Sequence, residues 1–239
     1  MKKNSISRLF IAGVVLNSCL ALIHGANLSA QDLKSQNIFA AAPVLPKDLK
    51  RVVVLPLACE ESRADLSGGC ETLDPILQAE LVKTKKFEVV PAGSERLNNL
   101  TGRSGWTGAE VLPGSFFDSL QRAYGCDAVL FCQLTTFRAY APLAVGWRMK
   151  LVDAHTQKII WAADEVFDAG EPAVAKDAEQ FQKQQQNVHG ETRSLLKSLF
   201  KFADREPRSA LDDQWAIMNS PRYFGQYSAA KLLQTLPER

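Results

Sequence analysis

The feature that most constrains the fold of this 239-residue chain is a short apolar run that ends at a proline. Residues 52–55 are Val-Val-Val-Leu, and Pro56 follows them. A strand with one solvent-exposed face alternates apolar and polar residues, whereas a strand covered on both faces is apolar throughout. The run therefore predicts a buried strand, which requires other elements of the chain to cover a sheet.

Two helices are predicted downstream from residues that favour helix ends. Asp74 is a typical N-cap residue and Pro75 suits the first helical position, so we expect a helix from there to Thr84. A second helix is expected after Ser115, and Gly125 ends it because glycine readily adopts the left-handed conformation at a helix C-terminus. Each helix lies between two predicted strands.

Four further strands are predicted, and their connections indicate how the sheet is built. They comprise residues 87–91, 127–134, 145–152 and 158–167. Helical crossovers join the early strands, whereas residues 153–157 form a polar connection of hairpin length between the last two. The Gly- and Asn-rich residues 93–114 are interpreted as a connection. The expected fold class is α/β (α+β), a mixed sheet of about five strands with helices packed on one side of it.

The first 30 residues have the pattern of a secretory signal. Three basic residues precede residue 10, and an uncharged apolar run then extends from Leu9 to Ile23, with Asn17 and Ser18 inside it. This run is shorter than the ~20 apolar residues that a membrane-spanning helix needs. The pattern therefore predicts that the chain is exported.

Two cleavage positions remain open within residues 1–30. Residues 16–19 (Leu-Asn-Ser-Cys) resemble a bacterial lipobox, in which Cys19 would become the lipidated first residue of the mature chain. The alternative is cleavage after Ala30, which would make Gln31 the first residue. A lipid on Cys19 would attach the protein to a membrane face.

The charge balance argues against a nucleic-acid partner. The chain has 28 Lys and Arg residues against 26 Asp and Glu residues. Lys2, Lys3 and Arg8 belong to the leader, however, and the first acidic residue is Asp32. The mature chain is thus close to neutral, whereas nucleic-acid-binding domains carry a basic excess.

Export would place Cys59, Cys70, Cys126 and Cys132 in an oxidising compartment. Cys126 and Cys132 flank a predicted strand, which would hold their Cα atoms about 20 Å apart, too far for a disulfide. Cys59 and Cys70 bracket a polar segment with a Gly pair that allows the chain to turn back. We therefore predict a Cys59–Cys70 disulfide, with Cys126 and Cys132 as buried thiols.

Motifs for catalysis, cofactors and metals are not found in the sequence. It has no Gly-x-Ser-x-Gly elbow, no phosphate-binding loop, no Gly-x-Gly-x-x-Gly, no His-Glu-x-x-His and no Cys-x-x-Cys. His155 lies in the predicted hairpin connection and is interpreted as a solvated side chain. Trp106, Trp147 and Trp161 are interpreted as core residues. We therefore predict no catalytic residue, no cofactor and no metal site.

Two segments flank the predicted α/β domain, residues 51–168. Residues 31–50 contain two prolines and no periodicity, and are predicted to be a tether. Residues 169–239 are predicted to be a helical extension.

Within this extension, residues 173–202 form either one helix interrupted at Gly190 or two helices. A further amphipathic helix is expected to open at Ser220 and Pro221 and to pack back on the domain.

Four segments, taken in order, resemble a group of bacterial envelope proteins. They are residues 51–57, 86–90, 124–130 and 151–161, and the last, Leu-Val-Asp-Ala-His-Thr-Gln-Lys-Ile-Ile-Trp, is the most specific. The group includes the curli-secretion lipoprotein CsgG, the penicillin-binding-protein activator LpoB, the flagellar lipoprotein FlgO and the amino-terminal domain of TolB. The resemblance implies a compact α/β domain in the periplasm, often lipid-anchored, that acts through protein contacts without catalysis.

These observations favour a non-enzymatic exported protein, a lipoprotein or a free periplasmic protein, that acts as an interaction or assembly module in the cell envelope. Its partner would be another envelope protein, and a lipid on Cys19 would hold it at the outer membrane. One alternative is a component of an outer-membrane secretion channel, although the predicted hairpins lack the added length that membrane-spanning strands need. A lesser alternative is a thiol-dependent or hydrolytic enzyme that uses Cys126, Cys132 or His155.

Overall fold

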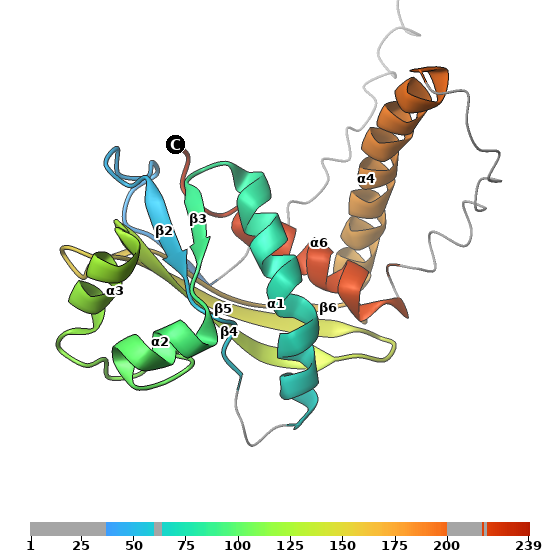
Figure 1. Ribbon diagram of the computed structural model, residues 1–239. Helices are drawn as coiled ribbons and strands as arrows, with labels where there is room; N and C mark the ends of the chain where they lie inside the picture. The colour runs from blue at the N-terminus through green and yellow to red at the C-terminus, as the bar shows by residue number, and fades with distance from the viewer. Residues whose placement is uncertain (1–36, 60–63, 200–216, 218) are drawn as a thin grey trace, which may run out of the picture. The chain divides into compact units, whose positions relative to one another are not determined.

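A computed structural model describes residues 37–59, 64–199, 217 and 219–239, without the side chains of residues 64–65 and 186–199 (Figure 1). These residues belong to one compact unit, Ser35–Arg239. The predicted signal sequence, both cleavage positions and Cys19 lie outside the described residues.

The described residues form a mixed six-stranded sheet. Its strands are β1 (Ile38–Ala40), β2 (Arg51–Val54), β3 (Glu88–Pro91), β4 (Ala128–Arg138), β5 (Ala144–Asp153) and β6 (Ile159–Asp168). Their order across the sheet is β1-β6-β5-β4-β2-β3. β2 runs parallel to β3 and β4, whereas the β4–β5, β5–β6 and β6–β1 pairs are antiparallel. The mixed sheet is therefore confirmed, with β1 as an additional strand.

The helices are α1 (Ala64–Thr84), α2 (Ser94–Thr101), α3 (Phe116–Tyr124), α4 (Pro172–Leu199) and α6 (Pro221–Leu233). α3 ends as predicted, because Gly125 has a φ of 61° and its N–H donates to the carbonyl oxygen of Gln121 (2.7 Å). α2 lies in the stretch that the sequence analysis interpreted as a connection. α4 continues through Gly190 as one helix.

α1 begins well before the predicted N-cap, so the expected start at Asp74 is wrong. Asp74 lies inside the helix, where its carboxylate accepts hydrogen bonds from the Leu57 N–H (3.0 Å) and from Gln78 Nε2 (2.8 Å). The added first turns pack on the sheet, and a Cβ at Gly69 would fall 2.7 Å from the Phe137 ring. Gly69 thus permits a close helix–sheet contact, and the Gly68–Gly69 pair lies within the helix and does not form a turn.

Helices cover both faces of the sheet, which corrects the prediction of helices on one side. Val52 and Val54 pack with α1 and α6, whereas Val53 and Leu55 pack with α2 and α3. We call these two hydrophobic clusters the α1/α6 core and the α2/α3 core. The uninterrupted apolar run of β2 is explained by this arrangement, because both of its faces are covered.

Residues 37–50 pack against the sheet, so the predicted tether at residues 31–50 is wrong for this part. β1 pairs with β6, and Leu45 and Leu49 are buried in the α1/α6 core. The Leu45 N–H donates to the carbonyl oxygen of Glu238 (2.7 Å), which joins the two ends of the described chain. A three-residue strand is too short to show the alternation that identifies strands.

The helical extension packs back on the domain, as predicted for its last helix. α6 begins at Pro221 and lies beside α1, on the same face of the sheet (Figure 1). The buried Trp147 indole N–H donates to Ser228 Oγ of α6 (2.9 Å), and the Trp161 indole N–H donates to Thr235 Oγ1 (3.2 Å). These bonds satisfy the polar groups of both core tryptophans.

Candidate functional site

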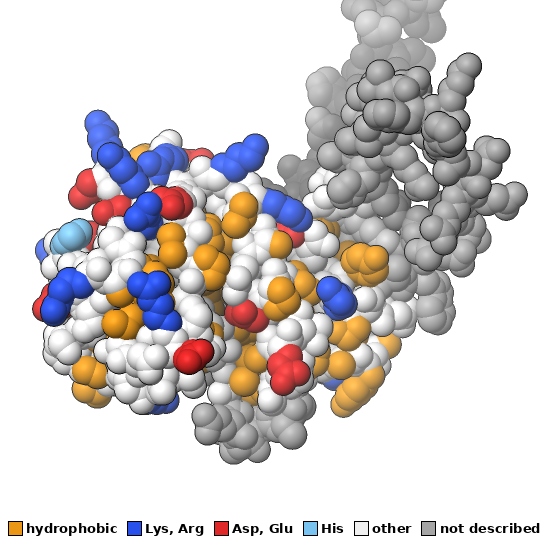
Figure 2. All heavy atoms as spheres, in the orientation of Figure 1, with side chains coloured by type: hydrophobic (Ala, Val, Ile, Leu, Met, Phe, Trp, Pro, Cys, Tyr) orange, Lys and Arg blue, Asp and Glu red, His pale blue; other side chains and the backbone are white. Residues whose placement is uncertain are grey.

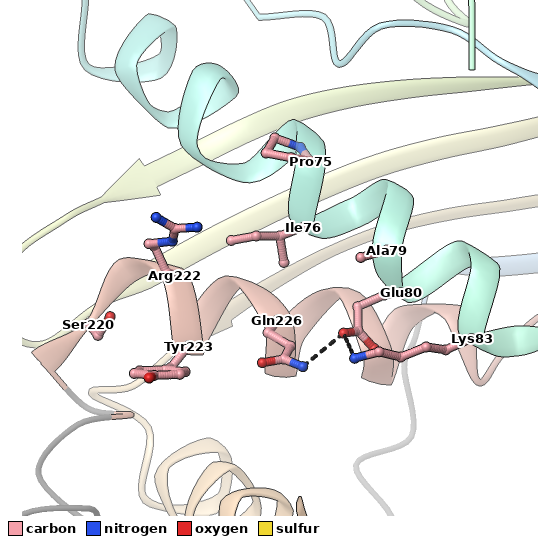
Figure 3. A pocket seen from close by; sticks show the side chains of 9 residues that line it. All are labelled: Pro75, Ile76, Ala79, Glu80, Lys83, Ser220, Arg222, Tyr223 and Gln226. Carbon is pink, nitrogen blue, oxygen red and sulfur yellow. Dashed lines mark hydrogen bonds and ion pairs between the residues drawn. The ribbon is translucent and has the colours of Figure 1, made fainter.

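A groove of about 570 Å³ lies between α1 and α6 (Figure 3). Among the described residues, those that line it belong to these two helices, apart from Ser220, which precedes α6. They are Pro75, Ile76, Ala79, Glu80 and Lys83 of α1, and Ser220, Arg222, Tyr223 and Gln226 at or in α6. The groove therefore depends on two helices that lie far apart in the sequence.

Close packing below the groove sets the spacing of the two helices. A Cβ at Gly225 would lie 2.3 Å from Leu73 Cδ2, so only glycine lets α6 approach α1 this closely. One turn on, the Ser228 hydroxyl donates to the Gly225 carbonyl oxygen (3.0 Å) and accepts from Trp147. The position of α6 is thus fixed against both α1 and β5.

A nearly buried carboxylate joins the two helices at the side of the groove. Glu80 is 5% exposed, and its Oε1 accepts hydrogen bonds from Lys83 Nζ (2.5 Å) and Gln226 Nε2 (2.9 Å). Figure 3 shows these side chains converging from α1 and α6. Burying a charge is costly unless it is paired and hydrogen-bonded, and Glu80 is both. This arrangement compensates its charge and holds the groove in shape.

The end of the groove near the start of α6 combines an exposed aromatic ring with an uncompensated positive charge. Tyr223 is 54% exposed, and Arg222 is also exposed. Within the described residues, the Arg222 guanidinium makes no hydrogen bond or ion pair. In the view of Figure 2, hydrophobic side chains lie at the surface among charged ones on the α1 side of the molecule. The groove thus offers apolar walls and one free cation.

The two cysteines of the predicted disulfide lie together as thiols. Cys59 is half-buried just after β2, Cys70 is buried in α1, and Cys59 packs against the α1/α6 core that contains Cys70. All four cysteines of the described residues are free thiols in this structure. The Cys59–Cys70 disulfide therefore stays a prediction.

The residues named for an enzyme are not brought together. Cys126 belongs to the α2/α3 core and Cys132 to the α1/α6 core, on opposite faces of the sheet. Burial raises the pKa of Cys126 to about 11 and that of Cys132 well above its ordinary value, so both thiols stay protonated near neutral pH. His155 is exposed, with Nδ1 3.2 Å from Gln121 Nε2. No thiol–imidazole pair forms among these residues.

No metal cluster and no membrane-spanning helix is found in the described part of the chain. None of its His, Cys, Asp and Glu residues gather in groups of three or more that could hold a metal ion. None of its helices has the length and apolar composition to cross a bilayer.

The groove residues were not among the predicted site residues. Glu80 and Lys83 have the i,i+3 spacing of a helical ion pair, which more often marks a solvated helix face than a site. Tyr223 belongs to the apolar pattern of the predicted last helix. Sequence alone does not show that these two helices lie beside one another.

No family model matches this chain, and no curated protein matches it. Several solved structures are similar to about half of it. Lipoprotein GNA1162 from Neisseria meningitidis is 20% identical and covers 49% of this chain and 79% of its own, with a TM-score of 0.36. The PelC dodecamer from Paraburkholderia phytofirmans is 15% identical over 58% of this chain and 85% of its own, with a TM-score of 0.37.

The C-terminal domain of LpoB from Salmonella enterica is 18% identical and covers 49% of this chain and 82% of its own, with a TM-score of 0.33. LpoB is also one of the proteins named in the sequence resemblance. The wider resemblance to CsgG, FlgO and TolB stays a prediction.

Proposed function

We propose that this chain is an exported, non-enzymatic envelope protein that binds an acidic amphipathic segment of another envelope protein in the groove between α1 and α6. The observation that carries the proposal is the end of the groove, where the exposed Tyr223 ring lies beside the unpaired Arg222. Tyr and Arg are enriched among the residues that dominate binding energy at protein interfaces.

The chemistry of the groove selects its occupant. Pro75, Ile76 and Ala79 offer apolar surface along α1, which favours apolar side chains on one face of the bound segment. Lys83 compensates the charge of Glu80, so Arg222 supplies the net positive charge. An acidic side chain next to the apolar ones would pair with the guanidinium, which binds carboxylates in bidentate geometry.

The leader supports the proposed location. Its basic residues and apolar run are typical of an export signal. With a lipid on Cys19, the residues up to Asn37 would allow the domain to reach no more than about 60 to 65 Å from the membrane surface. The partner would therefore lie close to the same membrane.

Site-specific photocrosslinking in living cells tests the groove. A photoreactive phenylalanine analogue replaces Tyr223 in the full chain, and the control replaces Tyr140, an exposed tyrosine (72%) in the β4–β5 connection. We expect an adduct from position 223, cross-linked to an acidic amphipathic segment, and none from position 140. Equal adducts at both positions would contradict the proposal.

A charge exchange tests the chemistry of recognition. Arg222→Glu should weaken the adduct by at least about ten-fold, because it replaces an attractive charge with a repulsive one. Lys158→Glu, which changes an exposed cation in the β5–β6 connection, is the control and should have no effect. Replacing the acidic residue of the captured segment by Lys should restore the adduct with Arg222→Glu. An adduct unaffected by Arg222→Glu would contradict the pairing.

A further inference from the structure

The backbone that leads into Cys59 is fixed on the sheet. The Ala58 N–H donates to the Cys132 carbonyl oxygen (2.9 Å), and the Leu134 N–H donates to the Ala58 carbonyl oxygen (2.9 Å). These bonds extend the pairing of β2 with β4 beyond the last residue of β2. Cys59 therefore follows a segment that is held in place by β4.

Cys70 is held opposite this segment by the packing of α1. Its neighbour Gly69 lies in close contact with Leu134 and Phe137, which leaves no room for the helix to shift toward the sheet. One turn further along α1, Asp74 Oδ1 accepts the Leu57 N–H (3.0 Å). Contacts before Cys59 and after Cys70 therefore hold α1 against the end of β2. The residues that precede the two cysteines, Ala58 and Gly69, both contact Leu134, and Cys59 packs against the core that contains Cys70.

We propose that Cys59 and Cys70 are a disulfide-forming pair that locks the first turns of α1 to the end of β2 once the chain has been exported. This inference does not depend on what occupies the groove. It rests on two thiols of one hydrophobic core, on elements that independent hydrogen bonds and packing hold together.

The oxidation proceeds by thiol–disulfide exchange with an incoming protein or small-molecule disulfide. The more accessible Cys59 loses its proton and attacks one sulfur of the oxidant, which releases one thiol and leaves a mixed disulfide. Cys70 then loses its proton and attacks the Cys59 sulfur. The Cys59–Cys70 bond forms, the mixed disulfide breaks, and the oxidant leaves as two thiols with the two protons.

The two other described cysteines are poor partners. Cys132 is fully buried (0% exposed), beneath α1 in the α1/α6 core. Cys126 lies on the opposite face of the sheet, in the α2/α3 core. An incoming disulfide does not reach either of them without local unfolding. The expected product therefore contains one disulfide and two thiols.

Thiol trapping of the exported full chain tests the pairing. Cells are quenched with acid, and the protein is denatured and alkylated with N-ethylmaleimide, before or after reduction. We expect alkylation at Cys126 and Cys132 before reduction and at all four cysteines after it, with one peptide pair linked through Cys59 and Cys70. Four alkylated cysteines before reduction, or a link to Cys132, would overturn the inference.

Unfolding by urea gives a second, independent measurement on the purified protein. Closing this short loop should raise the ratio of folded to unfolded protein by about a hundred-fold. Reductant should therefore destabilise the wild type and the control Cys126→Ala, and should leave Cys59→Ala unchanged. Cys59 is half-buried, so this variant keeps the packing of the core. An equal effect of reductant on the wild type and on Cys59→Ala would contradict the lock.

Discussion

The two faces of the sheet are covered by segments of different origin. The α2/α3 core is formed mostly by residues 92–131, so nearby parts of the chain fold over one face. The α1/α6 core joins residues as far apart as Leu45 and Leu236. The groove and the Cys59–Cys70 pair both belong to this second face. Long-range packing thus builds the face that carries the groove and the cysteine pair, whereas a largely continuous part of the chain covers the other face.

Removing a large buried side chain from the α2/α3 core should have the largest effect on stability. Phe116 is 1% exposed, stacks on Phe131 with ring centroids 5.8 Å apart and contacts Trp106 edge-on. Phe116→Ala should lower the free energy of unfolding by about 3 to 5 kcal/mol, because it removes a buried ring and leaves a cavity. Urea unfolding measures the loss. A loss below about 1 kcal/mol would show that this core is loosely packed.

Displacing α6 should have the next largest effect and should also remove the groove. Gly225→Val places a side chain where Leu73 Cδ2 lies 2.3 Å from the Cβ position, and should cost about 1 to 3 kcal/mol. The control Gly105→Val has open space around its Cβ and should stay within about 0.5 kcal/mol of the wild type. The crosslink from position 223 should be lost in the first variant only. A crosslink from position 223 that persists with Gly225→Val would show that the groove does not depend on the close packing of α6 on α1.

The Glu80 contacts should contribute less, because they lie at the edge of the same face. Glu80→Ala removes the acceptor of Lys83 and Gln226, and should cost about 1 kcal/mol, since the Lys83 side chain is 54% exposed and can be solvated. Glu71→Ala, at an exposed position of α1, is the matched control and should have no measurable effect. Equal effects of the two variants would show that Glu80 does not hold the helices together.

The smallest expected effect is a pH dependence from Asp74, between α1 and the end of β2. Burial raises the pKa of Asp74 above its ordinary value, although hydrogen bonds from Leu57 and Gln78 act in the opposite direction. The folded state therefore binds a proton more tightly than the unfolded state, so this carboxyl contributes less stability as the pH rises through its pKa.

Asp74→Asn should remove this contribution. The stability of the wild type relative to this variant should fall as the pH rises from below the ordinary Asp pKa of about 4 through the raised pKa of Asp74, as measured by urea unfolding at each pH. The contribution of Asp168 to stability should instead grow as the pH rises, because hydrogen bonds from Gly170 and Arg138 lower its pKa. A wild-type stability that rises with pH relative to Asp74→Asn would contradict the assignment.

Most of the sheet was predictable from the sequence, because its strands follow simple local patterns. The run at residues 52–55 predicts burial on both faces, and the hairpin of β5 and β6 follows from its polar connection. β1 was missed because three residues carry too little pattern. The start of α1 was missed because Pro75 and the Gly pair favour a break locally, and packing on β4 overrides that preference.

The site was less predictable, since its two helices meet only in the folded chain. Glu80 and Gln226 are 146 positions apart, and nothing local to either helix indicates the other. The cysteine pair was predicted because the polar segment between Cys59 and Cys70 was expected to form a loop. In the structure, Cys70 lies in α1. The proximity of the two thiols arises from the pairing of residue 58 with β4 and from the packing of α1.

The most direct test of the proposed function is the affinity of the purified protein for the segment captured at position 223. Fluorescence anisotropy with a labelled peptide of that segment compares the wild type, Tyr223→Ala and Tyr140→Ala. We predict that Tyr223→Ala weakens binding by at least about ten-fold, that Tyr140→Ala leaves it unchanged, and that added salt weakens binding to the wild type. Equal affinities for Tyr223→Ala and the wild type would contradict binding in the α1/α6 groove.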